Sequence, residues 1–426
     1  MTPALAPAPA STPASTRRIL LASLIGTSVE FYDFYIYATA AALVFGPLFF
    51  PADDPALQLL ASYASFGLAF FARPLGAVVF GHFGDRLGRK STLVASLMLM
   101  GGSTVAIAFL PSHAQIGWVA PLLLCLLRFG QGLGLGGEWG GASLLAVENA
   151  PAGQENRWGM FPPLGAPIGF IAANGFFLLL GAVLSDQQFR EWGWRLPFLA
   201  SSVLVGLGLW VRLKLTETPA FREAAARDAL PRVPIAQLFR HHLRATAAGT
   251  VGVVACFALF YLTTAFALSY GTTTLGHGRQ AFLGLEIGAI LFLALGVIVS
   301  CTLADRTGAP RMLRWGFVGC VASGLLMGPM LGSASLWIVF AWLALSLFAM
   351  GFAYGPLGGW LPSLFDSGVR YTGVSITFNL GGILGGALAP IAAQMLAIRG
   401  GLPLVGLYLV VAGLLSLAGL TLLDRR

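Results

Sequence analysis

A short polar stretch decides the fold of this chain because it occurs twice. It reads Gly84-Asp85-Arg86-Leu87-Gly88 in the first copy and Ala304-Asp305-Arg306-Thr307-Gly308 in the second. The two aspartates are 220 residues apart, close to half of the 426-residue chain. Each copy follows one long apolar run and precedes another. The repeat therefore predicts two halves built to the same plan.

The composition places these halves in a membrane. The chain is 57% hydrophobic and 10% charged, whereas about a quarter of the residues of a soluble domain are charged. A helix needs roughly 20 apolar residues to span a bilayer. Apolar stretches of about this length or longer predict twelve spans, at 19–49, 56–80, 91–110, 117–147, 157–184, 194–215, 245–275, 281–303, 311–331, 335–364, 371–398 and 401–423.

The predicted fold class is thus an all-α polytopic membrane protein with twelve transmembrane helices in two pseudo-symmetric six-helix bundles. We expect a disordered cytoplasmic N-terminal tail (1–18), an N-terminal bundle (19–215), a central cytoplasmic loop (216–244), a C-terminal bundle (245–423) and a short cytoplasmic C-terminus (424–426). Two such halves can expose a site near the bilayer midplane to each side in turn. The two halves suffice for this, so we expect a monomer.

The positive charges predict the orientation. The net charge is +8, and 19 cations fall in the termini and loops of one side, against four on the other: Arg190, Arg195, Arg279 and Arg399. Because Lys and Arg accumulate in cytoplasmic loops, both termini are predicted to be cytoplasmic in a plasma (bacterial inner) membrane. The basic charge is therefore a topology signal, and we expect no nucleic-acid partner.

The few ionisable residues inside the spans are candidates for function, because charges at bilayer depth are costly unless they face a cavity or a partner. Glu30 and Asp33 lie three residues apart in the first span and share one helix face. Two neighbouring acids in apolar surroundings suit proton binding. The alternative is that they anchor the cytoplasmic end of the helix.

The fourth span carries a polar stripe of Arg128, Gln131 and Glu138. Arg128 is a natural counter-ion for Asp33 or Glu30. Protonation of the acid would release Arg128 to hold a substrate carboxylate. The alternative is a static buried ion pair. Glu138 is either a second proton site or a hydrogen-bonding group in a closely packed glycine-rich region.

Other polar residues of the spans have competing interpretations. Arg73 can be a second ligand for a substrate anion, or it can pair with an acid on a neighbouring helix. Glu286 lies close to the outer loop and to Arg279, so we expect it at the membrane interface. Tyr354 and Asn379 are the candidates in the second half for hydrogen bonds to a substrate.

Several motifs resemble a known family. Residues 81–90 are similar to the signature between the second and third spans of the major facilitator superfamily, and Arg128-x-x-Gln131-Gly132 resembles its fourth-span motif. Further segments, at 30–34, 73–76, 136–142, 192–198, 217–221 and 369–373, resemble the metabolite:proton symporter family. Members of that family carry shikimate, citrate, 2-oxoglutarate, proline or betaine. The resemblance implies the major facilitator fold and a pairing between an acid of the first span and Arg128.

The repeated loop is predicted to control gating. Its glycines permit close packing, and the resemblance implies that Asp85 lies against the start of span 11 near Arg370, while Asp305 lies against the start of span 5 near Arg157. The predicted gating residues are Gly81, Gly84, Asp85, Arg86, Gly88, Arg89, Lys90, Arg157, Asp305, Arg306, Gly308 and Arg370. The second copy departs from the pattern, because Ala309-Pro310 follows Gly308 where the first copy has Arg89-Lys90.

These features predict a secondary transporter for proton-coupled uptake of a small organic acid or zwitterionic metabolite. Its partners are then the substrate, protons and the lipid bilayer. No phosphate-binding loop, zinc-ligand spacing or nucleophile motif occurs, so we expect no enzyme activity, cofactor or metal. The alternatives within transport are a proton antiporter that exports its substrate and an uncoupled facilitator. A membrane enzyme or a transporter-like sensor is disfavoured, because neither a catalytic set nor an added soluble domain is visible.

Overall fold

The computed structural model describes residues 13–87, 89–136, 138–148, 150–213, 238, 240–366 and 369–424, which form helices joined by short connections. The helices of the first half are α1 (Pro13–Ala40), η1 (Ala41–Phe45), α2 (Gly46–Phe49), α3 (Pro55–Leu87), α4 (Arg89–Ile107), α5 (His113–Ile116), α6 (Val119–Leu135), α7 (Glu138–Glu148), α8 (Glu155–Gly159), α9 (Phe161–Val183), α10 (Asp186–Gln188), η2 (Phe189–Gly193) and α11 (Arg195–Leu213). Those of the second half are α14 (Leu243–Tyr261), η3 (Leu262–Phe266), α15 (Ala267–Thr273), α16 (Arg279–Thr307), α17 (Ala309–Leu331), α18 (Leu336–Tyr354), α19 (Leu357–Ser363), α20 (Arg370–Gly382), η4 (Ile383–Ala387) and α21 (Leu388–Asp424).

Within the described part of the chain, helices cover most of each predicted span. Eight helices among these residues are long and apolar enough to cross a membrane, and shorter apolar helices cover Val94–Ile107 and Arg195–Trp210. Helix α21 holds the end of predicted span 11 and all of span 12, and its backbone breaks at Gly400 and at Gly401, where φ is +70°. Glycine alone adopts this conformation readily, so the break provides the turn between the two spans.

The N-terminal boundary differs from its prediction. Helix α1 begins at Pro13, so residues 13–18 are helical although we expected a disordered tail over 1–18. Proline is well tolerated in the first turn of a helix, where its missing N–H has no intrahelical partner. Residues 1–12 and most of the predicted central loop lie outside the described residues.

Wide π-helical turns interrupt the first helix of each half. They are η1, directly after α1, and η3, directly after α14. A π-turn inside an α-helix costs regular hydrogen bonding and is often found at functional sites. The first span of each half therefore has a built-in irregularity at one level.

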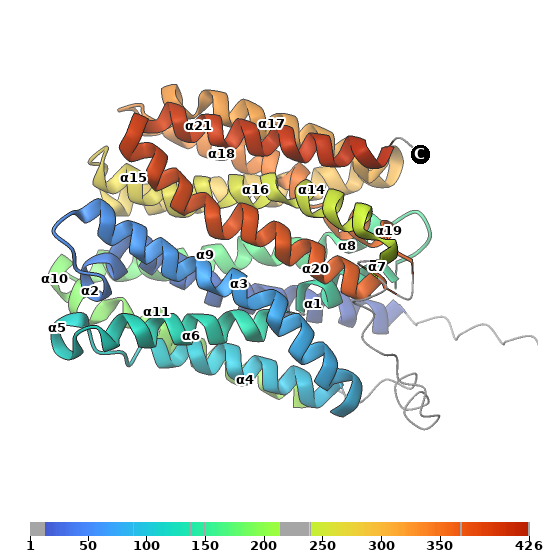
Figure 1. Ribbon diagram of the computed structural model, residues 1–426, viewed down its shortest axis with the longest axis horizontal. Helices are drawn as coiled ribbons and strands as arrows, with labels where there is room; N and C mark the ends of the chain where they lie inside the picture. The colour runs from blue at the N-terminus through green and yellow to red at the C-terminus, as the bar shows by residue number, and fades with distance from the viewer. Residues whose placement is uncertain are drawn as a thin grey trace, which may run out of the picture.

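The two halves lie side by side (Figure 1), with the helices before residue 213 on one side and those after residue 243 on the other. They meet along two seams, in which α9 packs against α16, and α3 packs against α20, η4 and α21. The shorter helices α2, α5, α10 and α15 lie at one end of the molecule, and α8 and α19 at the other. The domain boundaries themselves stay a prediction.

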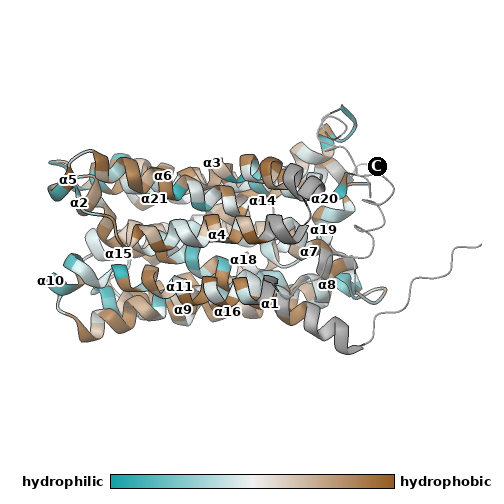
Figure 2. Cartoon of the chain, turned by 90° about the horizontal axis from the view of Figure 1, so that it is seen from below, coloured by the Kyte–Doolittle hydropathy of each residue, from teal (hydrophilic) through white to brown (hydrophobic). Residues whose placement is uncertain are grey.

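The distribution of side chains fits a bilayer. Figure 2 shows most hydrophilic residues at the two ends of the molecule and mainly hydrophobic residues along the helices between the ends. Large apolar side chains are exposed on the outside, including Val203 at 72% and Leu325 at 68%. Exposed apolar surface of this extent requires a cover, which the lipid tails provide.

Replacing Gly132 by Ala should weaken the packing between α3 and α6. A Cβ atom at Gly132 would overlap the backbone of Ala69, including its carbonyl oxygen, so the two helices would have to separate. Overpacking of this kind costs about 1–3 kcal/mol. We expect a lower melting temperature in detergent. Gly102→Ala is the matched control, because a Cβ there meets nothing within 4 Å; equal melting temperatures for the two variants would contradict the prediction.

Candidate functional site

Asp33 lies where three helices of the first half meet. Its side chain on α1 is buried, with 2% of the residue exposed. The hydroxyl of Ser201 on α11 donates a hydrogen bond to Oδ1. The hydroxyl of Thr104 on α4 lies 3.4 Å from Oδ2 and 3.0 Å from the Met100 carbonyl oxygen, and its one proton can be donated to either acceptor. Two hydroxyl donors stabilise a carboxylate, and each can turn to accept a hydrogen bond once the carboxyl group carries a proton.

Arg128 is joined to Asp33 through intermediates. Its Nη1 donates to Gln131 Oε1 at 2.8 Å, and Gln131 Nε2 donates to Thr104 Oγ1 at 2.7 Å. Thr104 in turn contacts Asp33. The result is a chain of hydrogen bonds, Arg128–Gln131–Thr104–Asp33, which we call the relay.

Within the described helices, the expected ion pair between Arg128 and an acid of the first span is not formed. Among the described residues, no acid forms a salt bridge with Arg128, which is completely buried. Its guanidinium carbon lies 4.1 Å from the ring centroid of Tyr37 and 4.2 Å from that of Phe34. Cation–π contacts of this kind stabilise a desolvated cation. The sequence showed the spacing of Arg128 and Gln131, but it could not show that aromatic rings would surround the charge.

A cavity of about 30 Å³ lies between the halves. Its polar lining residues are Glu30, Tyr35, Arg73, Trp139, Tyr261, Tyr354, Ser375 and Asn379. The volume holds about two water molecules, whereas small-molecule sites measure about 300–1,000 Å³. The halves therefore close tightly around the cavity, and a substrate needs them to separate.

Arg73 contributes the positive charge of this cavity. The residue is 8% exposed, and its guanidinium carbon lies 4.5 Å from the Phe34 ring centroid and 4.9 Å from that of Phe70. Its Nε has no hydrogen-bond partner, and no salt bridge involves Arg73 in the part of the chain that the structure describes. A buried cation with an unused donor at a cavity is suited to bind an anion.

The predicted substrate residues divide into two groups. Arg73, Tyr354 and Asn379 line the cavity, whereas Arg128 and Gln131 belong to the relay beside it. Asn379 Nδ2 donates to the Gly136 carbonyl oxygen at 2.9 Å, and Tyr354 OH accepts from Trp139 Nε1 at 3.2 Å. Both bonds cross from the second half to the first, so these side chains hold the halves together in this conformation.

The predicted proton residues are separated as well. Glu30 is 7% exposed and lines the cavity, and Asp33 lies in the relay. Glu138 is half-buried outside the cavity lining, and Ser96 donates to its Oε1 at 3.4 Å. The structure does not bring Glu138 to Asp33.

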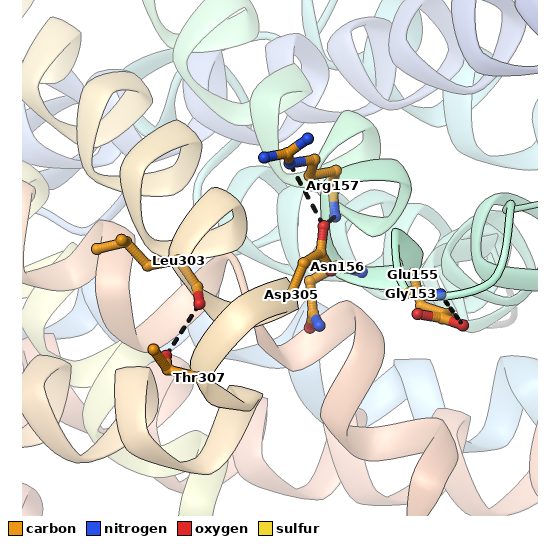
Figure 3. A network of polar contacts seen from close by, with 7 residues as sticks. All are labelled: Gly153, Glu155, Asn156, Arg157, Leu303, Asp305 and Thr307. Atoms are coloured by element: carbon orange, nitrogen blue, oxygen red, sulfur yellow. Dashed lines mark hydrogen bonds and ion pairs between the residues drawn. The ribbon is translucent and has the colours of Figure 1, made fainter.

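The second copy of the repeated loop joins the two halves (Figure 3). Asp305 at the end of α16 accepts hydrogen bonds from the backbone N–H groups of Asn156 at 2.9 Å and Arg157 at 3.3 Å, and Arg157 Nε lies 3.5 Å from Oδ2. A carboxylate at the first turn of α8 is favoured by its free N–H groups. Gly308 ends α16 with φ +88° and lets α17 begin at Ala309.

The first copy of the repeated loop lies outside the described side chains. The side chains of residues 81–93, which include Gly81, Gly84, Asp85, Arg86, Arg89 and Lys90, lie outside the described residues, as does Gly88 entirely. At the helix that Asp85 was expected to face, Arg370 Nε donates to the Phe365 carbonyl oxygen at 3.3 Å. The contact between Asp85 and the start of α20 stays a prediction.

We expected Glu286 at the membrane interface. The structure places its side chain between the halves, with 1% of the residue exposed. Its distance along the chain from the outer loop suggested an interfacial position, but α16 is covered at that level by α9 of the first half. Sequence distance to a loop does not report which helix covers a residue.

Two helical halves that meet along two seams and enclose a small cavity form the architecture of a secondary transporter. The Major Facilitator Superfamily model matches residues 23–390. The chain is 49% identical over 418 residues to the inner membrane metabolite transport protein YhjE of Escherichia coli, covering 97% of this chain and 94% of the relative. It is 37% identical over 411 residues to the shikimate transporter of the same organism, covering 94% of this chain and 92% of that relative.

Solved structures show the same fold. One of them is the xylose transporter XylE from Escherichia coli. A solved structure of XylE, described as a proton:xylose symporter, superposes with a TM-score of 0.75 at 15% sequence identity and covers 97% of this chain and 96% of XylE. The chain belongs to the Major Facilitator Superfamily. It is a membrane transporter and not an enzyme, and its metabolite-transporting relatives agree with the branch that the sequence motifs indicated.

Proposed function

We propose that this protein takes up a small organic acid or zwitterionic metabolite together with protons by alternating access. The observation that carries the proposal is the position of Phe34. This residue follows Asp33 on α1, and its ring contacts the guanidinium groups of both Arg128, in the relay, and Arg73, at the cavity. A proton site and an anion site therefore share one aromatic side chain.

Coupling follows from this contact. When Asp33 binds a proton, its carboxyl group no longer needs the two hydroxyl donors, and the hydrogen bonds of Thr104 and Gln131 rearrange. Arg128 then loses its fixed partner and shifts against Phe34, which changes the packing around Arg73. Binding of a substrate carboxylate to Arg73 and protonation of Asp33 thereby favour the same conformation, as coupled transport requires.

The likeness to a shikimate transporter supports a carboxylate substrate, because shikimate carries one. Arg73 and Glu30, which carry opposite charges, both line the cavity, and two such side chains also suit the two charged groups of a zwitterion. On this proposal all twelve helical segments cross the inner membrane, both termini are cytoplasmic, and the protein acts as a monomer. The contact of Asp305 with α8 then closes the cytoplasmic side.

Uptake into proteoliposomes tests the proposal. Candidate carboxylates and betaines are first screened by thermal shift in detergent at two pH values, and a stabilising compound is then used in radiolabelled form. A symporter accumulates it when the interior is alkaline, by up to about tenfold per pH unit for one proton. Accumulation only with an acidic interior indicates an antiporter, and uptake that stops at equal concentrations under both gradients indicates a facilitator; either result would refute the proposal.

A further inference from the structure

Glu286 is a buried carboxyl group that the proposed coupling between Asp33 and Arg73 does not use. It lies seven residues into α16, or about 10 Å from the start of the helix. Its Oε1 has no hydrogen-bond partner, and within the described residues Glu286 forms neither a hydrogen bond nor a salt bridge. Burying an unpaired carboxylate costs several kcal/mol. The neutral, protonated form of Glu286 avoids this cost.

The surroundings of Glu286 form a second cavity at the seam between the halves. Its volume is about 10 Å³, which is close to the room of one water molecule. Tyr35, Ala38, Thr39 and Phe170 line it from the first half, and Thr264, Ala265, Leu268 and Glu286 from the second. Only Tyr35 also lines the central cavity. The site is thus separate from the relay, and it exists only while the halves are together.

Among the described residues, no positive charge lines this cavity. Tyr35 of α1 is its titratable lining residue besides Glu286, and α9 carries none. His277, in the loop before α16, lies against the ring of Phe282. The Tyr63 hydroxyl is occupied by the Ala265 carbonyl oxygen at 2.8 Å and by Ser269 Oγ at 2.6 Å. On α16 itself, Arg279 pairs with Asp186 at 2.8 Å. The charges of α8 and the basic residues of α17 lie near the other end of α16, where Asp305 contacts Arg157.

The wide turn η3 forms one wall of this cavity. Thr264 and Ala265 both belong to it, and the Thr264 hydroxyl donates to the Phe260 carbonyl oxygen at 2.7 Å. A π-turn leaves backbone groups without their regular α-helical partners, and such turns are frequent at functional sites. Here the irregular turn lies directly across the seam from Thr39 on α1.

We propose that Glu286 is a second proton-binding site and that its protonation permits the two halves to close at the outer side. When the outer side is open, water reaches the carboxyl group and a carboxylate is tolerated. Closure removes that water, so closure requires a bound proton. Arg279 and Asp186 connect the same helix to the first half at the outer end on the predicted topology, and this connection forms once Glu286 is neutral.

The proposal rests on the proposed proton-coupled function, but its test needs no substrate. Spin labels are placed on the exposed positions Gln187 and Thr274 through Gln187→Cys and Thr274→Cys, with Cys125→Ser as background because the other three native thiols are buried. The distance between the labels is measured by electron paramagnetic resonance in lipid nanodiscs over a range of pH. We expect a short distance at low pH and a growing population of longer distances as the pH rises.

Two variants identify the group that titrates. Glu286→Gln imitates the protonated carboxyl and should keep the short distance at every pH. Asp53→Asn removes an exposed acid in the loop between α2 and α3 and should respond like the parent protein. A pH response that is unchanged in Glu286→Gln, or that is lost in Asp53→Asn, would overturn the proposal.

Infrared spectroscopy of the unlabelled protein gives a second test that does not depend on the labels. The carbonyl stretch of a protonated carboxyl group should be present at neutral pH, disappear at the pH at which the outer side opens, and be absent in Glu286→Gln. A parent protein without this band would contradict the proposal. Failure of gradient-driven uptake with an intact pH-dependent closure would instead refute the proposed function alone.

Discussion

Replacing Asp33 by Asn should abolish proton-driven accumulation of substrate and leave exchange of substrate across the membrane intact. Asn has nearly the size of the carboxyl group and can keep contacts to Ser201 and Thr104, but it cannot bind or release a proton. The transporter can then alternate only as an uncoupled carrier. The ratio of internal to external substrate should fall from about ten per pH unit to about one.

The measurement compares two assays on the same proteoliposomes. Net uptake under a pH gradient should stop at equal concentrations, while exchange of radiolabelled for unlabelled substrate at equal pH should continue. Asp53→Asn, which alters an exposed acid outside the helices, is the control and should accumulate substrate normally. Concentrative uptake by the Asp33→Asn variant would remove Asp33 from the coupling mechanism.

Replacing Arg73 by Gln should weaken substrate binding by about 10- to 100-fold. Hydrogen bonds to charged groups contribute about 1.5–3 kcal/mol, and each 1.4 kcal/mol changes affinity tenfold. Arg73 is the cation of the central cavity lining, and its Nε has no hydrogen-bond partner. Arg73→Lys keeps the charge but loses the planar pair of donors, so its effect should be intermediate.

The apparent affinity of Arg73→Gln is measured by thermal shift in detergent and by the concentration dependence of uptake. Arg311→Gln, at an exposed position on α17, provides a matched loss of one positive charge and should bind substrate normally. The proposal assigns the carboxylate to Arg73 rather than to Arg128. Unchanged affinity in Arg73→Gln would therefore reject Arg73 as the anion ligand.

Most of the fold could be predicted because it depends on properties that are local in sequence. Long apolar runs give the helices, and the repeated loop around Asp85 and Asp305 gives the two halves. The start of α1 at Pro13 was missed because six polar or small residues before the apolar run carry no periodic signal. Fold class and family were accessible without coordinates, whereas the ends of the helices were not.

The site was less accessible, because it depends on which helices meet. Arg128 and Asp33, which the sequence singled out as charges within apolar spans, are both buried. Thr104 and Ser201, which connect to Asp33, are ordinary hydroxyl residues in apolar helices. The aromatic surroundings of Arg128 come from α1 and α3, far from it in sequence. Glu286 was placed at the interface for a similar reason, since only the packing of α9 on α16 shows that it is buried.

The wide turns η1 and η3 occupy equivalent places in the two halves. They begin at Ala41 and Leu262, so they are 221 residues apart, within one residue of the 220 that separate Asp85 and Asp305. A π-turn holds one more residue than a regular helical turn. The two halves therefore share an irregularity of the backbone as well as a loop motif, so the repeat extends from the sequence to the local helix geometry.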